Sequence, residues 1–392
     1  MSEISRTGWN HKIHALWQSG NRKEAIQKMV YALNQHPSKK PKTAILQLGY
    51  YLFLINDYAS GANLFKTALQ SYPADHELLS NLAVYLSRGK NYKEAVQYVK
   101  EALVHYPEDY LLWDILAASH YHLNNEQEAS DAGTSSLNLK DKRHSGKLKG
   151  WSLPKRSASQ VTSGKKRVIS FCLWGKNTRY LHGALRNLLL APDIYPGWEL
   201  WFYVDSSIPS NYLKLMKHLG AHLIHKPENQ PLKDKLCWRF QVANASDVGY
   251  FLIRDADSVI SVREQRTVQE WLESDRFFHV IRDWWTHTDL ILAGLWGGVA
   301  GVLPDIQKKL ANYSSVHLET PNIDQWFLRD ELWRYIRKDC LIHDRCFKQQ
   351  GSQPFPGLSP TDSFHVGCCE GSKYPKFQEK MLAPWLEYLK KL

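Results

Sequence analysis

The sequence is poor in cysteine, and it contains no apolar run long enough to cross a membrane. Its 392 residues include only six cysteines, spaced irregularly at Cys172, Cys237, Cys340, Cys346, Cys368 and Cys369. A disulfide framework would need more of them at regular spacing, so we expect most to be reduced. No segment approaches the roughly 18–20 apolar residues of a bilayer-spanning helix, and the chain opens on a mostly polar stretch. We therefore expect no signal peptide, no membrane span and a cytoplasmic protein.

Acidic residues are scarce in one short segment. The formal net charge is +11, and between residues 140 and 167 ten Lys or Arg face the single acid Asp141. The segment is rich in Ser and Gly, so we interpret residues 140–166 as a solvated basic linker. Such a segment can also bind an anionic membrane surface or an acidic partner. Nucleic acid is not expected as a partner, because basic and aromatic residues are not interleaved here.

Apolar residues are plentiful, and in the first part of the chain they repeat. The composition is 43% hydrophobic and 12% aromatic, enough for two or three folded domains. Within residues 1–139 a period of 34 relates three sets of residues: Leu48, Leu82 and Leu116; Gly49, Ala83 and Ala117; Pro73 and Pro107. This spacing resembles tetratricopeptide repeats, in which small residues let paired helices approach closely and a proline ends the second helix.

We expect four such helix pairs, the first separated from the others by a two-residue insertion. An array of this kind exposes a concave groove that can capture a peptide or protein partner. The alternative is a platform for dimerisation or for packing against the second domain. His, Cys and acidic residues do not cluster at ligand spacing here, so we expect no catalysis in this region.

From residue 165 onward, strand-like runs alternate with helical stretches. Strands are predicted at 168–173, 199–204 and 221–224, and a helix at 179–190. This alternation implies a parallel sheet with a binding crevice at the carboxyl ends of its strands. Trp174, Asp205 and Asp255 follow predicted strands and would meet at this crevice.

The second region is organised around two acids that end a short apolar run. The run Tyr250-Phe251-Leu252-Ile253 leads through Arg254 to Asp255-Ala256-Asp257. In an extended segment Asp255 and Asp257 point to the same side. Two carboxylates on one side suit Mg²⁺ or Mn²⁺, which can bridge to a diphosphate.

These features resemble the Rossmann-like catalytic domain of metal-dependent glycosyltransferases, the GT-A fold with its Asp-x-Asp motif. Over residues 165–346 the chain is similar to a bacterial group of uncharacterised glycosyltransferase-like proteins, whose members often carry tetratricopeptide repeats. The matching motifs are Cys237-Trp238-Arg239-Phe240, Phe251 to Ser258, Arg263-Glu264, Phe278 to Asp283 and Leu295-Trp296-Gly297. The chain departs from the group at Trp284, where a proline is expected. The expected fold is therefore a TPR-like helical solenoid followed by a GT-A-like α/β domain at residues 167–392.

The resemblance implies a nucleoside-diphosphate sugar, with a UDP-sugar favoured, as the donor. Asp255 and Asp257 would hold Mn²⁺ or Mg²⁺ on its diphosphate, with Asp255 also near the ribose. Arg239 and Arg254 would pair with phosphate through their planar guanidinium groups. The alternative for Arg254 is a salt bridge to Asp255 or Asp283. The base would lie in the segment that contains Trp174 and Tyr180, with Tyr180 stacking on it or packing into the core, and Asp205 would line the same crevice.

Further site residues are predicted downstream. Asp324, at the start of a helical pattern, is either an N-terminal cap or an acid near the acceptor that serves as general base. Arg282 and Asp283 hold each other or contact the donor sugar. His343 is the first choice for a third metal ligand, and His365 is the second. The aromatic residues Trp284, Trp285 and His287 and the stretch Trp296-Gly297-Gly298 suit a sugar or lipid-linked acceptor, or else form a core loop.

Three other interpretations remain open. The Cys and His residues between Cys340 and Cys369 could form a structural zinc site, although their spacing matches no standard finger. The Asp255 motif also matches phosphatases of the haloacid-dehalogenase type, which place the nucleophile on their first strand and not after several strands. Finally, the chain could be a binding scaffold whose second domain is catalytically silent. We favour a glycosyltransferase whose repeats recruit a protein, peptide or surface-glycan acceptor.

Overall fold

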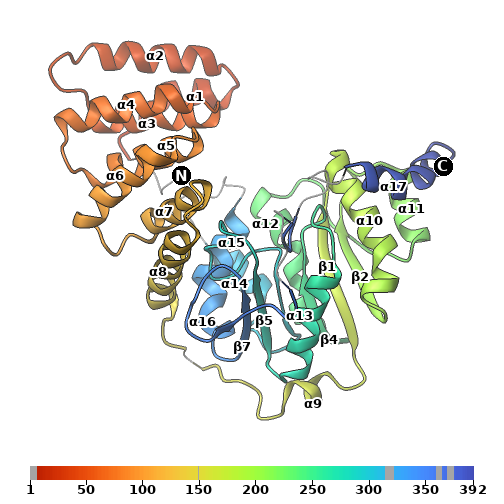
Figure 1. Ribbon diagram of the computed structural model, residues 1–392. Coiled ribbons are helices and arrows are strands. Elements are labelled where there is room, and N and C mark those ends of the chain that lie inside the picture. Colours follow the sequence, from red (N-terminus) through yellow and green to blue (C-terminus); the bar gives the residue numbers. More distant parts are fainter. Residues whose placement is uncertain (1–6, 149, 314–321, 359–363, 369–374) are drawn as a thin grey trace. The chain divides into compact units, whose positions relative to one another are not determined.

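The chain forms two compact units, residues 1–140 and 141–392, which we call the repeat unit and the sheet unit. The computed structural model describes residues 7–148, 150–313, 322–358, 364–368 and 375–392 (Figure 1). Within these residues, no helix has both the length and the apolar character needed to cross a bilayer.

The repeat unit consists of antiparallel helix pairs, as the 34-residue period predicts. Their buried faces form two apolar clusters, one centred on Phe65 and Tyr85 and the other on Val99 and Leu112. The helices are α1 (His11–Gln18), α2 (Arg22–Asn34), α3 (Lys42–Leu54), α4 (Tyr58–Ser71), α5 (His76–Arg88), α6 (Tyr92–His105), α7 (Tyr110–His122) and α8 (Glu126–His144), of which the residues from Asp141 onward belong to the sheet unit.

The turn inside each pair repeats at one backbone position. Gly20, Asn56, Lys90 and Asn124 have left-handed φ angles of +89°, +61°, +64° and +61°. Consecutive positions are 36, 34 and 34 residues apart, so the predicted two-residue insertion lies between the first of these turns and the second. Small residues let the helices approach. A Cβ atom on Gly61 would lie 1.9 Å from Cε1 of Tyr85, which is itself buried.

In the part of the chain that the structure describes, the sheet unit is built on eight strands in the order β3-β2-β1-β4-β6-β5-β7-β8. Strand β6 is antiparallel to both β4 and β5, and the other pairings are parallel. The prediction of a parallel sheet is therefore wrong for one strand, β6. The strands are β1 (Lys166–Leu173), β2 (Trp198–Val204), β3 (His222–His225), β4 (Val248–Ile253), β5 (Phe278–Arg282), β6 (Trp296–Val299), β7 (Cys340–Asp344) and β8 (Ser352–Gln353).

Strand β6 contains the Trp-Gly-Gly stretch that the sequence offered as an acceptor surface or a core loop. Trp296 is fully buried in the sheet, so this stretch cannot contact an acceptor. The two glycines leave room for backbone and side-chain atoms of the neighbouring strands. A Cβ on Gly297 would lie 2.6 Å from the Phe251 carbonyl oxygen, and one on Gly298 would lie 2.8 Å from Cδ1 of Phe278.

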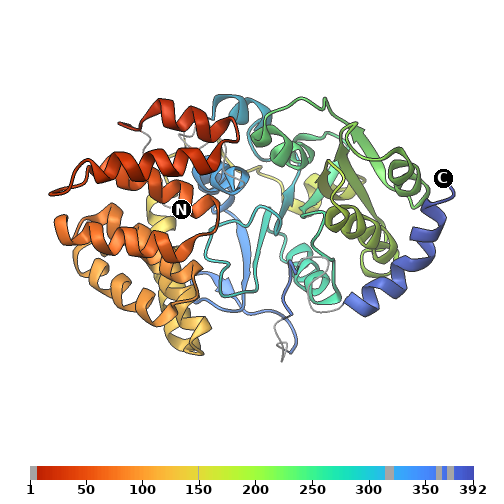
Figure 2. The same cartoon turned by 90° about the horizontal axis from the view of Figure 1, so that it is seen from above.

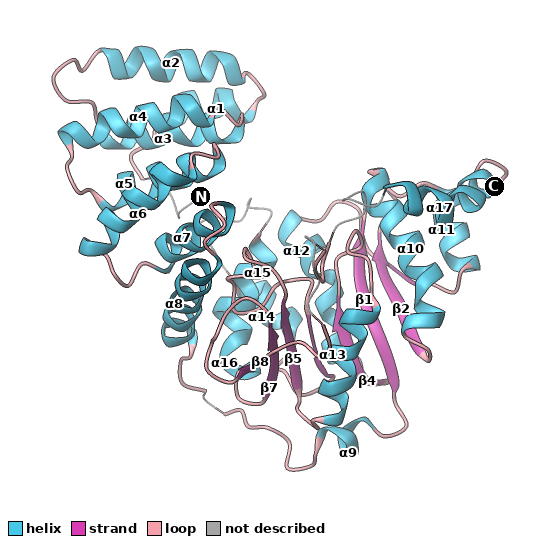
Figure 3. Cartoon of the chain, viewed as in Figure 1, coloured by secondary structure: helices cyan, strands magenta, loops and turns pink. Residues whose placement is uncertain are grey.

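Helices cover both faces of the sheet (Figure 2 and Figure 3). One group contains α10 (Thr178–Ile194), α11 (Ser210–His218), α13 (Val262–Glu273) and α17 (Pro375–Leu389). The other contains α12 (Leu232–Cys237), the 3₁₀ helix η1 (Trp238–Asn244), α14 (Ile306–Asn312), α15 (Ile323–Phe327), the π-helical turn η2 (Leu328–Leu332) and α16 (Trp333–Ile336).

Much of the segment expected to be a solvated linker is attached to the sheet unit. Asp141 accepts hydrogen bonds from Trp333 (2.7 Å) and Arg337 (2.8 Å). The Trp151 indole donates to the Val302 carbonyl over 2.9 Å. The short helix α9 (Ala158–Thr162) starts with a capping box at Ser157. Basic side chains nevertheless remain exposed, at Lys147, Lys155 and Arg156.

Candidate active site

A cavity of about 670 Å³ opens at the carboxyl ends of β1 and β4. The strand order reverses between these two strands, since β2 and β3 extend from one side of β1 and β4 lies on the other. Open α/β sheets bind ligands at such a switch point. Seven of the predicted site residues line the cavity: Trp174, Tyr180, Arg239, Asp255, Asp257, His287 and Asp324.

The two acids emerge from the end of β4 into a tightly packed loop. The side chain of Asp255 is 44% exposed, whereas that of Asp257 is 7% exposed. A Cβ on Gly294 would lie 2.1 Å from Oδ2 of Asp255, so this glycine makes room for the carboxylate. Behind the loop, Asn187 donates to the Ser258 carbonyl (2.8 Å) and accepts from a backbone N–H further along. Sequence reasoning missed both Gly294 and Asn187, because their contacts are long-range.

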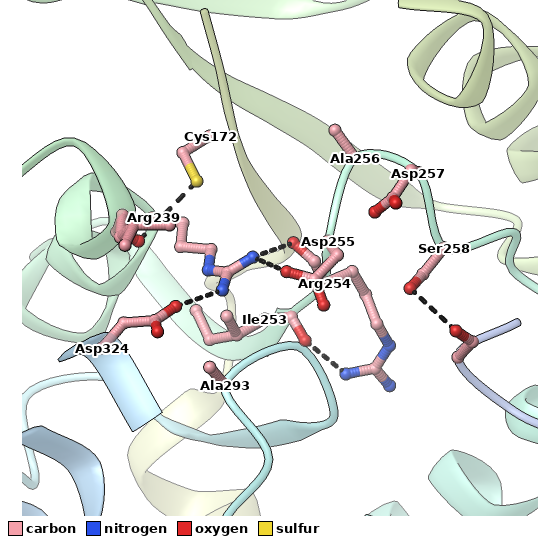
Figure 4. Close-up of polar contacts among 12 residues, drawn as sticks. Cys172, Arg239, Ile253, Arg254, Asp255, Ala256, Asp257, Ser258, Ala293 and Asp324 are labelled. Atoms are coloured by element: carbon pink, nitrogen blue, oxygen red, sulfur yellow. Dashed lines mark hydrogen bonds and ion pairs between the residues drawn. The ribbon is translucent and has the colours of Figure 1, made fainter. Parts of the chain in front are cut away.

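Arg239 joins two of the carboxylates (Figure 4). One terminal nitrogen donates to Asp255 and the other to Oδ2 of Asp324, over 2.8 Å. Its side chain is only 3% exposed, so the guanidinium is held in place. The predicted phosphate-binding Arg239 is therefore at the cavity, already paired with acids.

Asp324 lies on the first turn of α15, and its carboxylate is 5% exposed. Asn322 occupies the N-cap position, so the interpretation of Asp324 as the cap is wrong. Burial raises the pKa of Asp324 to about 6, against the opposing effect of Arg239. A carboxylate with this pKa is mostly ionised at neutral pH and can accept a proton.

Asp257 has its own arginine, which the sequence analysis did not select. Arg179, on the first turn of α10, donates from Nε to Oδ2 of Asp257 over 2.7 Å. The Arg179 side chain is 47% exposed. Burial and the nearby Asp255 raise the pKa of Asp257, and Arg179 opposes this effect. The only sequence signal was the position of Arg179 at the start of a helix that follows β1.

Four residues predicted to bind the donor or act in catalysis lie in buried ion pairs away from the cavity lining. Arg254 is 1% exposed and donates to Glu264 over 2.8 Å, not to Asp255 or Asp283. Neighbouring residues of an extended segment point to opposite sides, so Arg254 points away from Asp255. Arg282 pairs with Asp344 over 2.7 Å.

Asp283 is held by Arg263 (3.1 Å) and Arg345 (2.9 Å). The prediction that Arg282 and Asp283 hold each other is therefore wrong. Asp205 follows β2 as predicted, but it is fully buried and accepts from Lys235 over 2.7 Å. Although burial alone would raise it, the pKa of Asp205 is lowered overall by hydrogen bonds from Lys235 and Ser207. A carboxylate neutralised in this way has a structural role.

His343 does not join the two acids. It lies fully buried on β7, where its Nδ1 is 2.8 Å from Nε2 of His279 and its Nε2 is 2.9 Å from Glu270. Burial lowers the pKa of both histidines. His365 stacks on Trp284, with ring centroids 4.6 Å apart. Trp285 is partly exposed and His287 lines the cavity.

The described residues contain no group of three or more His, Cys, Asp or Glu side chains that could hold a metal ion. Apart from Cys369, which lies outside the described residues, the proposed zinc ligands therefore do not come together. Asp255 and Asp257 offer two hard oxygen ligands, and a Mg²⁺ site commonly uses one or two carboxylates and takes its other ligands from phosphate and water. The pair fits such a cation. Cys172 also lines the cavity, but burial raises the pKa of its thiol to about 12, so it is no nucleophile at neutral pH.

Comparison with known proteins concerns mainly the repeats. Residues 4–138 match the family described as ChAPs (Chs5p-Arf1p-binding proteins). No curated protein gives a significant match. Among solved structures, MamA from Desulfovibrio magneticus RS-1 is 18% identical with a TM-score of 0.30, and the alignment covers 33% of this chain and 72% of that one.

MamA MSR-1 is 17% identical with a TM-score of 0.31, over 34% of this chain and 75% of that one. A mutant O-GlcNAc transferase from Thermobaculum terrenum is 14% identical with a TM-score of 0.37, over 62% of this chain and 44% of that one. These TM-scores are too low to carry an argument. The helical repeats are therefore assigned from the spacing and geometry of this chain itself.

Proposed function

We propose that the sheet unit is a glycosyltransferase that uses a nucleoside-diphosphate sugar, and that the repeat unit recruits its acceptor. The observation that carries the proposal is the cavity at the switch point between β1 and β4, which contains Asp255, Asp257 and Asp324 beside Arg179 and Arg239. A GT-A assignment rests on the resemblance of the Asp255 motif, which ends a buried strand of a mixed sheet.

The donor would lie across the strand ends. Trp174 and the 39% exposed Tyr180 line one part of the cavity and offer aromatic faces to a base. Asp255 and Asp257 would hold Mg²⁺ or Mn²⁺, which when bound supplies positive charge to the departing diphosphate. Arg179 and Arg239 lie close enough to those acids to donate to phosphate oxygens.

Asp324 is the proposed general base, in a transferase that inverts the anomeric centre. Its position at the cavity wall allows contact with an acceptor hydroxyl, and its pKa of about 6 leaves it able to take a proton at neutral pH. Arg239 orients this carboxylate through its fixed hydrogen bond.

The acceptor is proposed to be a protein, a peptide or a surface-glycan intermediate. Its recruitment by the repeats is supported by the match to a family described as binding Chs5p and Arf1p. The exposed Lys147, Lys155 and Arg156 would favour an acidic partner or membrane surface. The same match also favours a second candidate, a scaffold whose sheet unit is catalytically silent. The ion pairs in the cavity support this candidate too, because Arg179 and Arg239 already neutralise Asp257 and Asp255.

A thermal-shift screen separates the two candidates. UDP, GDP, CMP and their sugars are tested with Mn²⁺, with Mg²⁺ and with chelator, on the wild-type protein and on Asp257→Ala. A cation-dependent stabilisation by one nucleotide that is lost in the variant supports the transferase, because only a ligand of the folded state raises Tm. If no nucleotide shifts the wild-type protein, the scaffold is the better description.

A further inference from the structure

The two acids of the Asp255 motif have arginine partners that differ in freedom to move. Arg239 is 3% exposed and is anchored by Asp324, which holds its second terminal nitrogen. Arg179 is 47% exposed and approaches Asp257 from the first turn of a helix. An exposed side chain can change rotamer at low cost, whereas a buried one held in a fixed geometry cannot. Asp257 therefore has an exchangeable partner, and Asp255 has a fixed one.

The remaining contacts fit this asymmetry. Asp255 uses Oδ1 for Arg239, while its Oδ2 lies in the space that Gly294 leaves open. Asp255 can therefore offer an oxygen to a cation without releasing its arginine. Asp257 accepts both nitrogens of Arg179 on the same atom, Oδ2. That atom is free for a cation only once Arg179 has moved.

The charges in the cavity make either ligand alone a poor fit. A free diphosphate faces the carboxylates of Asp255, Asp257 and Asp324, and a free cation faces Arg179 and Arg239. We propose that Arg179 is an exchangeable counter-ion, which holds Asp257 in the free protein and turns to the diphosphate when a nucleotide and a cation bind together. This inference rests on the proposed function and specifies how its donor is held.

The consequence is positive coupling between the two ligands. When Arg179 moves onto the phosphate, its guanidinium no longer competes with the metal cation for Asp257, and it adds a charge-assisted hydrogen bond to the nucleotide. Because coupling free energy is reciprocal, the nucleotide raises the affinity for the cation by the same factor as the cation raises that for the nucleotide.

The test measures Mn²⁺ binding by electron paramagnetic resonance, with and without UDP, on full-length wild-type protein, Arg179→Gln and Lys176→Gln. Lys176 lines the same cavity, is exposed, and makes no side-chain hydrogen bond or ion pair within the described residues, so its variant removes an equal charge without freeing Asp257. With Mn²⁺ alone, Arg179→Gln should bind about tenfold more tightly than wild type, and Lys176→Gln should stay close to wild type. The tightening by UDP should be smaller in Arg179→Gln than in the other two proteins.

Arg179→Lys provides a second check. It keeps the charge but loses the planar guanidinium, so its affinity for Mn²⁺ alone should lie between those of wild type and Arg179→Gln. If UDP and Mn²⁺ bind together but Arg179→Gln and Lys176→Gln behave alike with Mn²⁺ alone, the exchange is rejected while the proposed function stands. If the wild-type protein binds neither UDP nor a UDP-sugar in the presence of Mn²⁺, the proposed function fails and the exchange fails with it.

Discussion

Arg239 donates to Asp324 over 2.8 Å, although 85 positions separate the two residues in the sequence. This contact ties η1, beside β1 and β4, to α15 at the wall of the same cavity. Because the other end of the same guanidinium holds Asp255, one buried side chain sets the spacing between the proposed donor acid and the proposed base. A change at any of the three residues should therefore affect the other two.

Replacing Asp257 with Asn should abolish cation-dependent nucleotide binding. The amide keeps the shape but loses the charge that a divalent cation requires, so we expect the affinity for UDP with Mn²⁺ to fall by more than about tenfold. Isothermal titration calorimetry measures the effect, and circular dichroism checks that the fold survives. Asp247→Asn, at an exposed surface acid, is the control. Equal nucleotide affinity in both variants would remove Asp257 from the site.

The pKa of Asp324 predicts a pH dependence of activity. A general base must be ionised, so kcat/KM for donor turnover should fall about tenfold per pH unit once the pH drops below the pKa of about 6. UDP release from the sugar donor, followed between pH 5 and 8, measures the profile. In Asp324→Asn the amide oxygen can still accept from Arg239, so this variant should retain most of the donor binding and lose most of the rate. An unchanged acidic limb in the residual activity of this variant would assign that limb to another group.

Removing residues 1–140 should separate donor chemistry from acceptor recruitment. All of the cavity-lining residues that the structure describes belong to the sheet unit, so donor binding and slow donor hydrolysis should persist. Transfer to a natural acceptor should fall, mainly through a higher KM, because the proposed docking surface is gone. The measurement compares both proteins with the same acceptor at several concentrations. Equal transfer efficiency by the two proteins would reject the recruitment role.

The repeat unit and the position of the candidate cavity could be predicted from the sequence because both depend on local pattern. The 34-residue period reappears as left-handed turns at Asn56, Lys90 and Asn124. The apolar run before Asp255 is a fully buried strand, as its composition indicates. Strand β6 was missed as a strand because it has only four residues, two of them glycine.

The partners of charged residues could not be predicted, because they depend on contacts between distant segments. Asp257 pairs with Arg179, 78 positions away, and the assignment of His343 to the metal site failed because His279 and Glu270 hold it elsewhere. Arg254 is different. Neighbouring residues of an extended segment point to opposite sides, so its position next to Asp255 already indicated that Arg254 points away from this acid. The prediction that Arg254 contacts phosphate followed the family resemblance instead.

The buried histidine pair should make the sheet unit less stable in acid. Burial lowers the pKa of His279 well below its ordinary value near 6.5, and it lowers the pKa of His343 against the opposing effect of Glu270, so both bind protons less readily in the folded protein than in the unfolded chain. The unfolded chain then binds more protons, and stability falls as pH decreases, by up to about 1.4 kcal/mol per pH unit for each histidine. Urea unfolding between pH 7.5 and 5.5 should show a smaller loss in His279→Gln. The exposed His225→Gln is the control, and equal slopes in the two variants would contradict the assignment.

Gly294 gives the sharpest test of the site, because its only proposed role is to leave space. A Cβ at this position would lie 2.1 Å from Oδ2 and 2.6 Å from Cγ of Asp255, so Gly294→Ala must displace the carboxylate. We expect the affinity for UDP with Mn²⁺ to fall about tenfold or more, at a stability cost of about 1–3 kcal/mol. In an Asp255→Ala background the displaced group is absent, so adding Gly294→Ala should cost little further affinity. This double-mutant cycle, measured by calorimetry, reports the coupling of the two residues directly. Additive losses in the cycle would show that Gly294 acts independently of Asp255, and the carboxylate would then not be the group that this glycine accommodates.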